Sequence, residues 1–442
     1  MFKINYSAAM ADLIGEKQGI KSNELSFFLN QLKDEYNKFV KQTKEYGFIK
    51  TIKDDRYPED SKIFYEENKH FKNIVVLGIG GSALGFNAIL NLYSFKVLEK
   101  NFYVLDNIDP FLISNLFEKI TLKETLFFVI SKSGETVETL AQFLYAYNLI
   151  REAGHDVSEH FVIITDPKKG FLRQLAHNEQ IRAFSIPPEL GGRYSVLSYV
   201  GLLPASFLND NIAMLMEGAR AVENKLDEIF IFTTLLYLLN VRRGKNNLVI
   251  FPYCERLHMF SQWLSQLWAE SLGKKYGING EIIRNGQTPI IARGVTDQHS
   301  QLQLYLEGPK DKAVLMFKSN ERINLKLPEI FKDNDSVNYL CGKTFDELFE
   351  AEYRGTYGAF IKESVPVISF EVDELNLKTI GALFYFFELS CAMSGVFYNI
   401  NPFDQPAVEI GKKITFSILG KKGFEAHLEN IMSENKYELF IN

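Results

Sequence analysis

The chain contains 442 residues, of which 46% are hydrophobic, with 55 acidic residues (Asp and Glu) against 49 basic ones (Lys and Arg). This length is more than a single small core requires, so the sequence predicts two domains. The net charge of −6 disfavours proteins that bind nucleic acid or acidic membranes through a broad basic surface. An anionic ligand would therefore need a local pocket of basic side chains.

The cysteines indicate neither a disulfide framework nor a zinc module. Cys254, Cys341 and Cys391 are odd in number and far apart, without a CxxC pair, so we interpret them as reduced core thiols. The amino terminus reaches the acidic Asp12 before a signal-peptide core forms, and the longest apolar stretch, residues 380–387, is too short to span a bilayer. We therefore expect a cytoplasmic protein.

Residues 1–70 are polar, with scattered apolar positions at helical spacing, and predict a helical arm that packs on the larger domain and contains no strong strand. Residues 71–205 form the first, smaller domain. Short apolar runs there alternate with helix-length segments, and the runs are residues 73–77, 102–105, 125–130, 161–165 and 183–186. This alternation predicts an α/β fold with a parallel, doubly wound sheet, because parallel strands need crossovers and are buried on both faces.

Residues 206–442 form the second, larger domain. It opens with two helical stretches, residues 212–226 and 228–242. Strand-like runs follow, and further helices are predicted later in the chain. The strand-like runs are residues 248–252, 289–292, 313–317 and 365–370, and the helices are residues 375–393 and 407–419.

A glycine-rich loop follows the first strand. Its sequence is Gly78-Ile79-Gly80-Gly81-Ser82-Ala83-Leu84-Gly85, and it leads into a predicted helix. Glycines let the backbone approach a ligand closely, and the free N–H groups of a helix start favour an anion. The loop also satisfies the dinucleotide pattern G-x-G-x-x-A, with Asp106 at the end of the next strand as a ribose ligand. A glycine turn that only packs the helix on its strand is a third interpretation.

A second loop, rich in hydroxyl groups, follows the third strand. Ser131, Ser133 and Thr136 supply hydroxyls and Lys132 supplies a positive charge at a helix start, which suits a phosphate monoester better than a simple helix cap. If the strand order is 2-1-3-4-5, the two loops meet at the topological switch point, where ligands bind. A dinucleotide would leave the second loop without a ligand, whereas a sugar phosphate uses both.

A candidate base lies on the helix predicted at residues 257–273. Glu270 falls close to Trp263, at the border of the apolar face of that helix, where partial desolvation makes a carboxylate a stronger base. A surface acid is the alternative interpretation.

Three further candidates, His299, Arg193 and Lys412, carry chemistry of other kinds. His299 lies in a polar segment between two apolar runs and is either catalytic or a hydrogen-bonded loop histidine. Arg193 follows two glycines, which suits a guanidinium that faces a developing anion, although arginines in turns are also common as structural residues. Glu409 and Lys412 lie one helical turn apart and could form a simple ion pair. No histidine spacing indicates a zinc site.

Taken together, these motifs resemble those of the phosphoglucose isomerases (glucose-6-phosphate isomerases) of the bacterial type. The resemblance is carried by six motifs in the order of that family: Gly78-Ile79-Gly80-Gly81-Ser82, Ser131-Lys132-Ser133-Gly134-Glu135-Thr136-Val137-Glu138-Thr139, Gly191-Gly192-Arg193-Tyr194-Ser195, Glu270-Ser271-Leu272-Gly273-Lys274, Asp297-Gln298-His299-Ser300 and residues 401–412. One departure is Pro188, where the family usually has an acidic or small polar residue, and it puts in doubt only the geometry of the loop before Arg193.

The resemblance implies two sugar-isomerase (SIS) domains of the α-β-α type, a homodimer, no metal and no cofactor. It also implies reversible conversion of glucose 6-phosphate to fructose 6-phosphate through ring opening and a cis-enediol. By this resemblance Glu270 moves a proton between C2 and C1 while Arg193 stabilises the enediolate. His299, reaching in from the neighbouring subunit, opens the sugar ring with help from Lys412.

The resemblance also implies which residues hold the substrate. Seven residues would contact the phosphate and the sugar: Gly81, Ser82, Ser131, Lys132, Ser133, Thr136 and Gln405. Three alternatives remain at this point, namely a sugar-phosphate sensor without catalysis, a nicotinamide-dependent oxidoreductase, and isomerases of mannose or glucosamine phosphates. The sensor would not need Glu270, His299 and Lys412 together.

Overall fold

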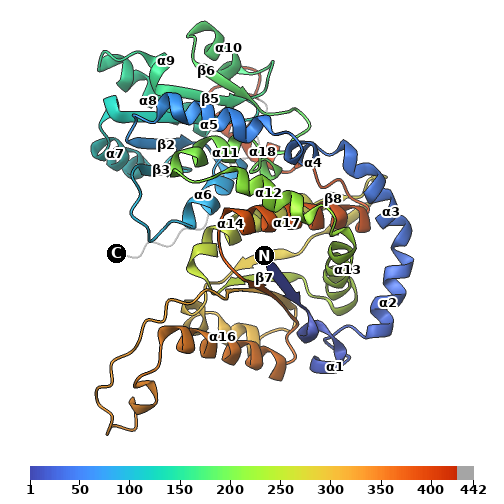
Figure 1. The fold of residues 1–442 in the computed structure, drawn as a ribbon. Coiled ribbons are helices and arrows are strands. Elements are labelled where there is room, and N and C mark those ends of the chain that lie inside the picture. The colour runs from blue at the N-terminus through green and yellow to red at the C-terminus, as the bar shows by residue number, and fades with distance from the viewer. Residues whose placement is uncertain (426–442) are drawn as a thin grey trace, which may run out of the picture.

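The structure is a computed structural model that describes residues 1–425, so residues 426–442 of the predicted second domain lie outside it. Two five-stranded sheets lie in opposite halves of the molecule, with helices between them and on their other faces (Figure 1). The chain is therefore an α/β protein built from two α-β-α sandwiches with mainly parallel sheets, as the sequence predicted.

The first sheet has the strand order β3-β2-β4-β5-β6, that is, 2-1-3-4-5, the order under which the two loops would meet. All its pairings are parallel. The strands are β2 (Asn73–Leu77), β3 (Asn101–Leu105), β4 (Thr125–Ser131), β5 (Phe161–Thr165) and β6 (Arg182–Ser185). Because β2 and β4 are neighbours, the two loops that follow them emerge side by side at the carboxyl edge of the sheet.

Alternate residues of each strand enter different cores. Ile74 and Val76 of β2 belong to one hydrophobic cluster, and Val75 and Leu77 belong to another. The first cluster receives helices α5 (Arg56–Asn68), α6 (Leu84–Asn91) and α11 (Tyr199–Ala205), and the second receives α7 (Pro110–Lys119), α8 (Val137–Glu152) and α10 (Phe171–Asn178). Helices therefore cover both faces of the first sheet.

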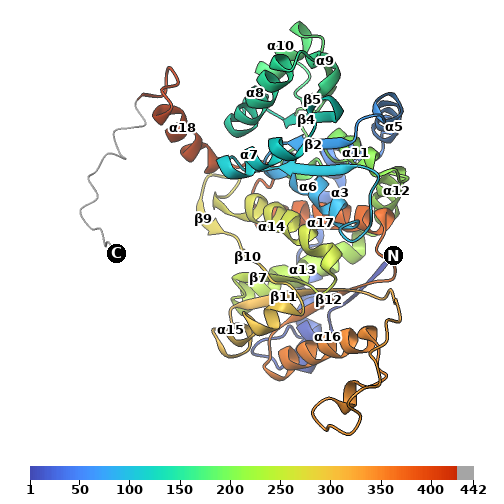
Figure 2. The ribbon, with the colours of Figure 1, turned by 90° about the vertical axis from the view of Figure 1, so that its left-hand side faces the viewer.

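The second sheet has the order β1-β12-β11-β7-β10, in which β1 (Phe2–Asn5) comes from the amino terminus. Its parallel strands are β7 (Asn247–Pro252), β10 (Thr288–Ile291), β11 (Lys312–Ser319) and β12 (Val367–Val372). One face packs against α15 (Leu302–Glu307) and α16 (Phe345–Lys362). The other face packs against helices that lie between the two sheets, namely α12 (Ala213–Val222), α13 (Leu226–Arg243), α14 (His258–Leu272) and α17 (Leu377–Phe397) (Figure 2).

The remaining elements are short or peripheral. They are α1 (Ala11–Ile14), α2 (Ser22–Gln31), α3 (Lys33–Gln42), α4 (Gly47–Ile52), α9 (Val157–His160), α18 (Val408–Ile418) and the two-stranded hairpin of β8 (Lys274–Tyr276) and β9 (Ile282–Asn285). Helix α18 projects away from the body of the molecule, and its residues are mostly exposed (Figure 2).

The expectation that residues 1–70 contain no strong strand is wrong. Strand β1 (Phe2–Asn5) pairs antiparallel with β12, with Phe2 opposite Val372. A run of four residues is too short to show strand periodicity, and its partner is distant in sequence. The rest of this arm contacts both halves of the molecule, because Tyr36 stacks on Phe230 of α13, whereas α5 packs against α11 of the first half.

Helix α17 is long and apolar enough to cross a membrane, although the apolar run at residues 380–387 looked too short to do so. However, 94% of its most apolar window is buried inside the protein, between the two sheets. It contacts α12, α13 and α14. This is the environment of a central core helix.

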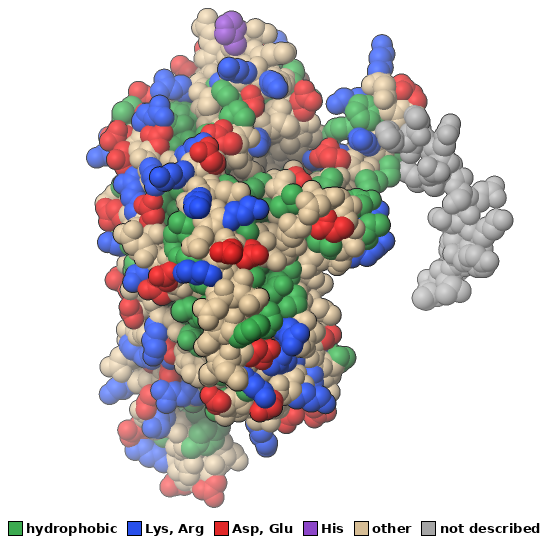
Figure 3. Space-filling view, turned by 90° about the vertical axis from the view of Figure 1, so that its right-hand side faces the viewer, with side chains coloured by type: hydrophobic (Ala, Val, Ile, Leu, Met, Phe, Trp, Pro, Cys, Tyr) green, Lys and Arg blue, Asp and Glu red, His purple; other side chains and the backbone are tan. Residues whose placement is uncertain are grey.

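The surface charges agree with the interpretation of the composition, and the thiols agree with it in part. In Figure 3 acidic and basic side chains are interspersed over the visible face instead of forming one basic patch. Cys254, Cys341 and Cys391 are all free, but the expectation that all three are core thiols is wrong: only Cys391 is buried, and Cys341 lies partly exposed in the loop at residues 320–345. The face in view therefore offers no broad surface for a polyanion.

Lys245, just after α13, is fully buried. Its Nζ donates to the side-chain oxygen of Gln18 and to the main-chain carbonyl of Lys310. Burial lowers its pKa to about 8, because the charged form loses solvation that nearby Asp311 only partly restores. An unfolded lysine has a pKa of about 10.4, so between about pH 8 and pH 10 the unfolded chain binds more protons than the folded one.

Stability should therefore rise with pH in this window because of Lys245. We expect the free energy of unfolding of the wild type, minus that of Lys245→Met, to increase by about 1–2 kcal/mol from about pH 8 to pH 10. Urea titrations at both pH values measure it. In the control variant Lys17→Met, which replaces an exposed lysine, the free energy of unfolding should change with pH as it does in the wild type. The prediction would be contradicted if the difference in unfolding free energy between the wild type and Lys245→Met were the same at both pH values.

Candidate active site

The glycine-rich loop after β2 packs against the turn that carries Arg193. Residues Gly80–Ser82 form a single 3-10 turn, in which Gly80 has a φ of +58°. A Cβ atom on Gly81 would lie 2.3 Å from the carbonyl carbon and oxygen of Gly192, closer than real contacts allow. Glycine is therefore required at position 81 because two backbones meet there. Ser82 is half-buried beside it.

The hydroxyl loop after β4 gathers its side chains at the start of α8. Ser131 Oγ lies 2.8 Å from Thr136 Oγ1, and Ser133 Oγ lies 3.5 Å from both. Three hydroxyls that converge at a helix start form a suitable cradle for a small anion.

Lys132 connects this loop to the segment that precedes Arg193 in the chain. Its Nζ donates to the main-chain carbonyl of Pro188 at 2.8 Å. Burial lowers the pKa of Lys132, and the charge of Arg193 acts in the same direction, while Asp166 and Glu189 oppose it. Pro188 stands where the family usually has an acidic or small polar residue. This difference is compatible with the geometry, because Lys132 contacts a main-chain carbonyl, which any residue would supply.

Arg193 lies at the centre of the cluster and is 3% exposed. Its Nη1 donates to Glu270 Oε2 at 3.1 Å and to Gln405 Oε1 at 2.9 Å. Its Nε donates to Ser271 Oγ at 2.6 Å. The planar guanidinium thus holds the predicted base and the predicted sugar contact in one plane of donors, which a lysine could not do.

The same guanidinium also holds the main chain of the turn at residues 401–405. Its Nη2 donates to the carbonyls of Pro402 at 2.6 Å and Asp404 at 3.1 Å. All three nitrogens of the guanidinium of Arg193 are therefore engaged, and the turn that carries Gln405 is tied to α14 through it.

Glu270 is held through both carboxylate oxygens. Oε2 faces Arg193, and Oε1 accepts a hydrogen bond from Gln266 Nε2 at 3.0 Å. Its side chain is 31% exposed, so it remains open to a ligand. Helical periodicity predicted Trp263 as its neighbour, but the polar partners of the carboxylate are Gln266 and, from a distant turn, Arg193.

Two of the predicted catalytic residues do not join this cluster. His299 is exposed at the end of a 3-10 turn (Thr296–His299), and no hydrogen bond or ion pair connects it to the cluster within residues 1–425. Lys412 is exposed on α18, where its Nζ lies 2.7 Å from Glu409 Oε1. This is the simple ion pair that the spacing also allowed. The single chain therefore assembles the two loops, Arg193, Glu270 and Gln405.

Comparisons with known proteins show which family the chain resembles. A model of the phosphoglucose isomerase family matches residues 64–436. The glucose-6-phosphate isomerase of Carboxydothermus hydrogenoformans is 40% identical over 421 residues, which cover 91% of this chain and 90% of that protein. That of Campylobacter jejuni is 37% identical over 369 residues, which cover 82% of this chain and 88% of that protein.

The chain belongs to the phosphoglucose isomerase family.

Solved structures agree with this membership. A hypothetical protein from Thermus thermophilus superposes with a TM-score of 0.86 at 32% identity, over 95% of this chain and 100% of that one. A glucose-6-phosphate isomerase from Chlamydia trachomatis superposes with a TM-score of 0.81 at 20% identity, over 95% of this chain and 88% of that one, and supports the fold. The first glycine loop had left open a nicotinamide-dependent oxidoreductase. Membership of a family of isomerases argues against that alternative.

Three residues of this family member contact the cluster although the sequence reasoning assigned them no role. They are Gln266, Ser271 and Lys274. Gln266 and Lys274 lie four residues before and after Glu270, so the i,i+4 spacing could have indicated both. Ser271 faces Arg193, which is 78 residues away in sequence, and local spacing carries no signal for such a contact.

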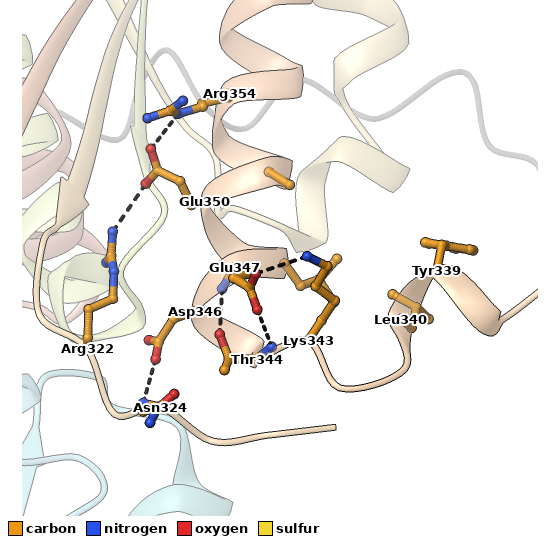
Figure 4. Close-up of a pocket in the computed structure, with 12 residues that line it drawn as sticks. Arg322, Asn324, Tyr339, Leu340, Lys343, Thr344, Asp346, Glu347, Glu350 and Arg354 are labelled. Carbon is orange, nitrogen blue, oxygen red and sulfur yellow. Dashed lines mark hydrogen bonds and ion pairs between the residues drawn. The ribbon is translucent and has the colours of Figure 1, made fainter. Parts of the chain in front are cut away.

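Another cavity, of about 770 Å³, lies at the base of the loop at residues 320–345 and contains none of the predicted site residues. Its charged side chains form ion pairs with one another, except Asp346, which accepts hydrogen bonds from the main chain of Ile323 and Asn324 (Figure 4). Glu350 accepts from Arg354 at 2.7 Å, and Lys343 Nζ lies 3.1 Å from Glu347 Oε1. Because these charges already have partners, this cavity is a weaker candidate for an anionic substrate than the two loops.

Proposed function

We propose that this protein catalyses the reversible isomerisation of glucose 6-phosphate and fructose 6-phosphate. The observation that carries the proposal is the contact of Arg193 with both Glu270 and Gln405, next to a cradle of hydroxyls suited to a phosphate. A base, a cation and a phosphate site are the three parts that proton transfer beside a carbonyl requires in a phosphorylated sugar.

Each group has a defined task in this proposal. Glu270 takes the proton from C2 and returns it to C1, and the guanidinium of Arg193 stabilises the negative charge that develops on the enediolate oxygen. The contact with Arg193 keeps the carboxylate and the cation in place before the substrate arrives, so little reorganisation is needed during the reaction. Gln405 contacts the sugar from the turn at residues 401–405.

The phosphate is remote from the reacting carbons, and its binding free energy serves to orient them. We assign the phosphate and the adjoining sugar hydroxyls to the two loops, that is, to Gly81, Ser82, Ser131, Lys132, Ser133 and Thr136. The proton transfer uses side chains alone, so the proposal requires neither a metal nor an organic cofactor, and turnover should survive exhaustive dialysis against EDTA.

We further propose that the enzyme works as a cytoplasmic homodimer in which His299 of each chain completes the site of the other and Lys412 assists ring opening. Two observations support this. His299 is exposed and lacks a polar partner within the described part of the chain. The loop at residues 320–345 also exposes large apolar side chains, among them Ile323 at 87% and Phe331 at 71%. The two SIS domains of each chain would be residues 71–205 and 206–442.

Two measurements test these proposals. A coupled assay that oxidises glucose 6-phosphate should show rapid turnover of fructose 6-phosphate, and the absence of turnover would exclude the isomerase and leave the sugar-phosphate sensor. Chains carrying His299→Ala and chains carrying Glu270→Gln should each be nearly inactive but regain activity when mixed and allowed to exchange subunits. If mass spectrometry shows that the subunits have exchanged but activity does not return, the shared site is ruled out.

A further inference from the structure

Lys274 is a buried cation to which the proposed reaction assigns no role. It lies just after α14, only 8% exposed, at the beginning of β8. Its Nζ donates to the main-chain carbonyl of Glu270 at 2.7 Å and to that of Asp404 at 2.5 Å. One ammonium group therefore joins the last turn of the helix that carries the base to the turn at residues 401–405.

Two buried cations converge on that turn. The carbonyl of Asp404 accepts hydrogen bonds from both Lys274 and Arg193, and the carbonyl of Pro402 accepts from Arg193 alone. Both cations donate to main-chain carbonyls of the turn, so their hold on the turn depends on the path of its backbone and not on its side chains. The carboxylate of Asp404 adds an ion pair with Lys274 at 3.2 Å, but it is half exposed and screened by solvent.

The position of Lys274 also suits the end of a helix. Carbonyls in the last turn of an α-helix lack intrahelical donors, and a cation there is stabilised by the helix dipole. The carbonyl of Glu270 is one of these groups, since α14 ends at Leu272. The ammonium of Lys274 thus supplies a donor to the helix end and to the turn at the same time.

We propose that Lys274 is a positioning residue that clamps the turn at residues 401–405 to the carboxyl end of α14. The clamp keeps Gln405 against Arg193, and it sets the point from which the chain continues into α18. Lys274 does not itself touch the reacting atoms. The inference rests on the proposed function for its effect on catalysis, but the clamp can be measured without any assay of activity.

The test compares Lys274→Met with Lys275→Met, which removes the same charge from the exposed neighbouring residue. Hydrogen–deuterium exchange should become faster in peptides covering residues 401–419 of Lys274→Met and remain unchanged in Lys275→Met. Turnover of Lys274→Met should fall about 10- to 100-fold, as expected when reacting groups are displaced by about 1 Å. The Michaelis constant for fructose 6-phosphate should change less than about threefold, because the phosphate loops are untouched.

Two results of the exchange experiment overturn the proposal. Unchanged exchange at residues 401–419 excludes the clamp, and faster exchange spread equally over α14 and α17 means that Lys274 serves general stability. If Lys274→Met does not fold, Lys274→Gln carries the same test, because its uncharged amide is one bond shorter than the lysine side chain and cannot join both carbonyls. Exchange at residues 401–419 equal to that of the wild type would then exclude the clamp. A wild type without isomerase activity refutes the proposed function, whereas the exchange experiment still decides on the clamp.

Discussion

Replacing Glu270 by glutamine should lower the turnover of fructose 6-phosphate by about two to four orders of magnitude, the contribution usual for a general base. Glutamine has nearly the same shape and still accepts a hydrogen bond from Arg193, so the fold and the phosphate loops should be preserved. The affinity for sorbitol 6-phosphate, an analogue that cannot isomerise, should therefore change only a few-fold. Initial rates in the coupled assay and calorimetric titration of the analogue measure the two quantities.

The control for this variant is Glu307→Gln, which removes the charge of an exposed glutamate on α15. Its turnover should equal that of the wild type. Near-normal turnover of Glu270→Gln would end the assignment of Glu270 as the base. Equal losses of turnover and analogue affinity would show instead that Glu270 serves binding.

Replacing Arg193 by lysine should lower kcat/KM by about two to three orders of magnitude, although the positive charge is kept. The ammonium of lysine is a compact group at the end of a shorter side chain. It cannot reproduce the contacts of the planar guanidinium with Glu270, Gln405 and Ser271. The buried carbonyl of Pro402 would also lose its donor, and each unsatisfied acceptor costs about 1–3 kcal/mol of stability. Steady-state kinetics and thermal unfolding measure the two effects.

Arg182→Lys is the matched control, because Arg182 is an exposed arginine of the same half of the molecule. It should retain full activity and an unchanged melting temperature. The role of Arg193 as the cation that stabilises the enediolate would be refuted if Arg193→Lys lost stability but kept its kcat. A loss of kcat without loss of stability would show that the contacts of Arg193 with the turn contribute little to the fold.

The local chemistry of the two loops was readable from the printed residues. Glycines at 80 and 81 and hydroxyls at 131, 133 and 136 follow short buried runs of Val, Ile and Phe, and each run is long enough for one strand. Parallel strands require crossovers, which places both loops at the same edge of the sheet. The strand order remained a condition at the level of the sequence, and the structure decided it by pairing β2 with β4.

Strand β1 shows where such reasoning stops. Its four residues are too few for a periodic pattern, and it is a strand because Phe2 lies opposite Val372, near the other end of the chain. The burial of α17 could not be inferred either, since a buried core helix and a membrane span have the same composition. In both cases the deciding contacts come from elements that are remote in sequence.

The composition and motifs of this chain defined which groups are present at the site: a carboxylate on a helix, an arginine after two glycines, and a loop of hydroxyls with one lysine. Folding decided which of them touch. Arg193 reaches Ser271 and Pro402, separated from it by 78 and 209 positions, and Lys274 reaches Asp404 across 130. Hydrogen bonds act over about 3 Å and in fixed directions, so residue types alone do not specify the partners, and only the packing of α14 against the turn at residues 401–405 selects them.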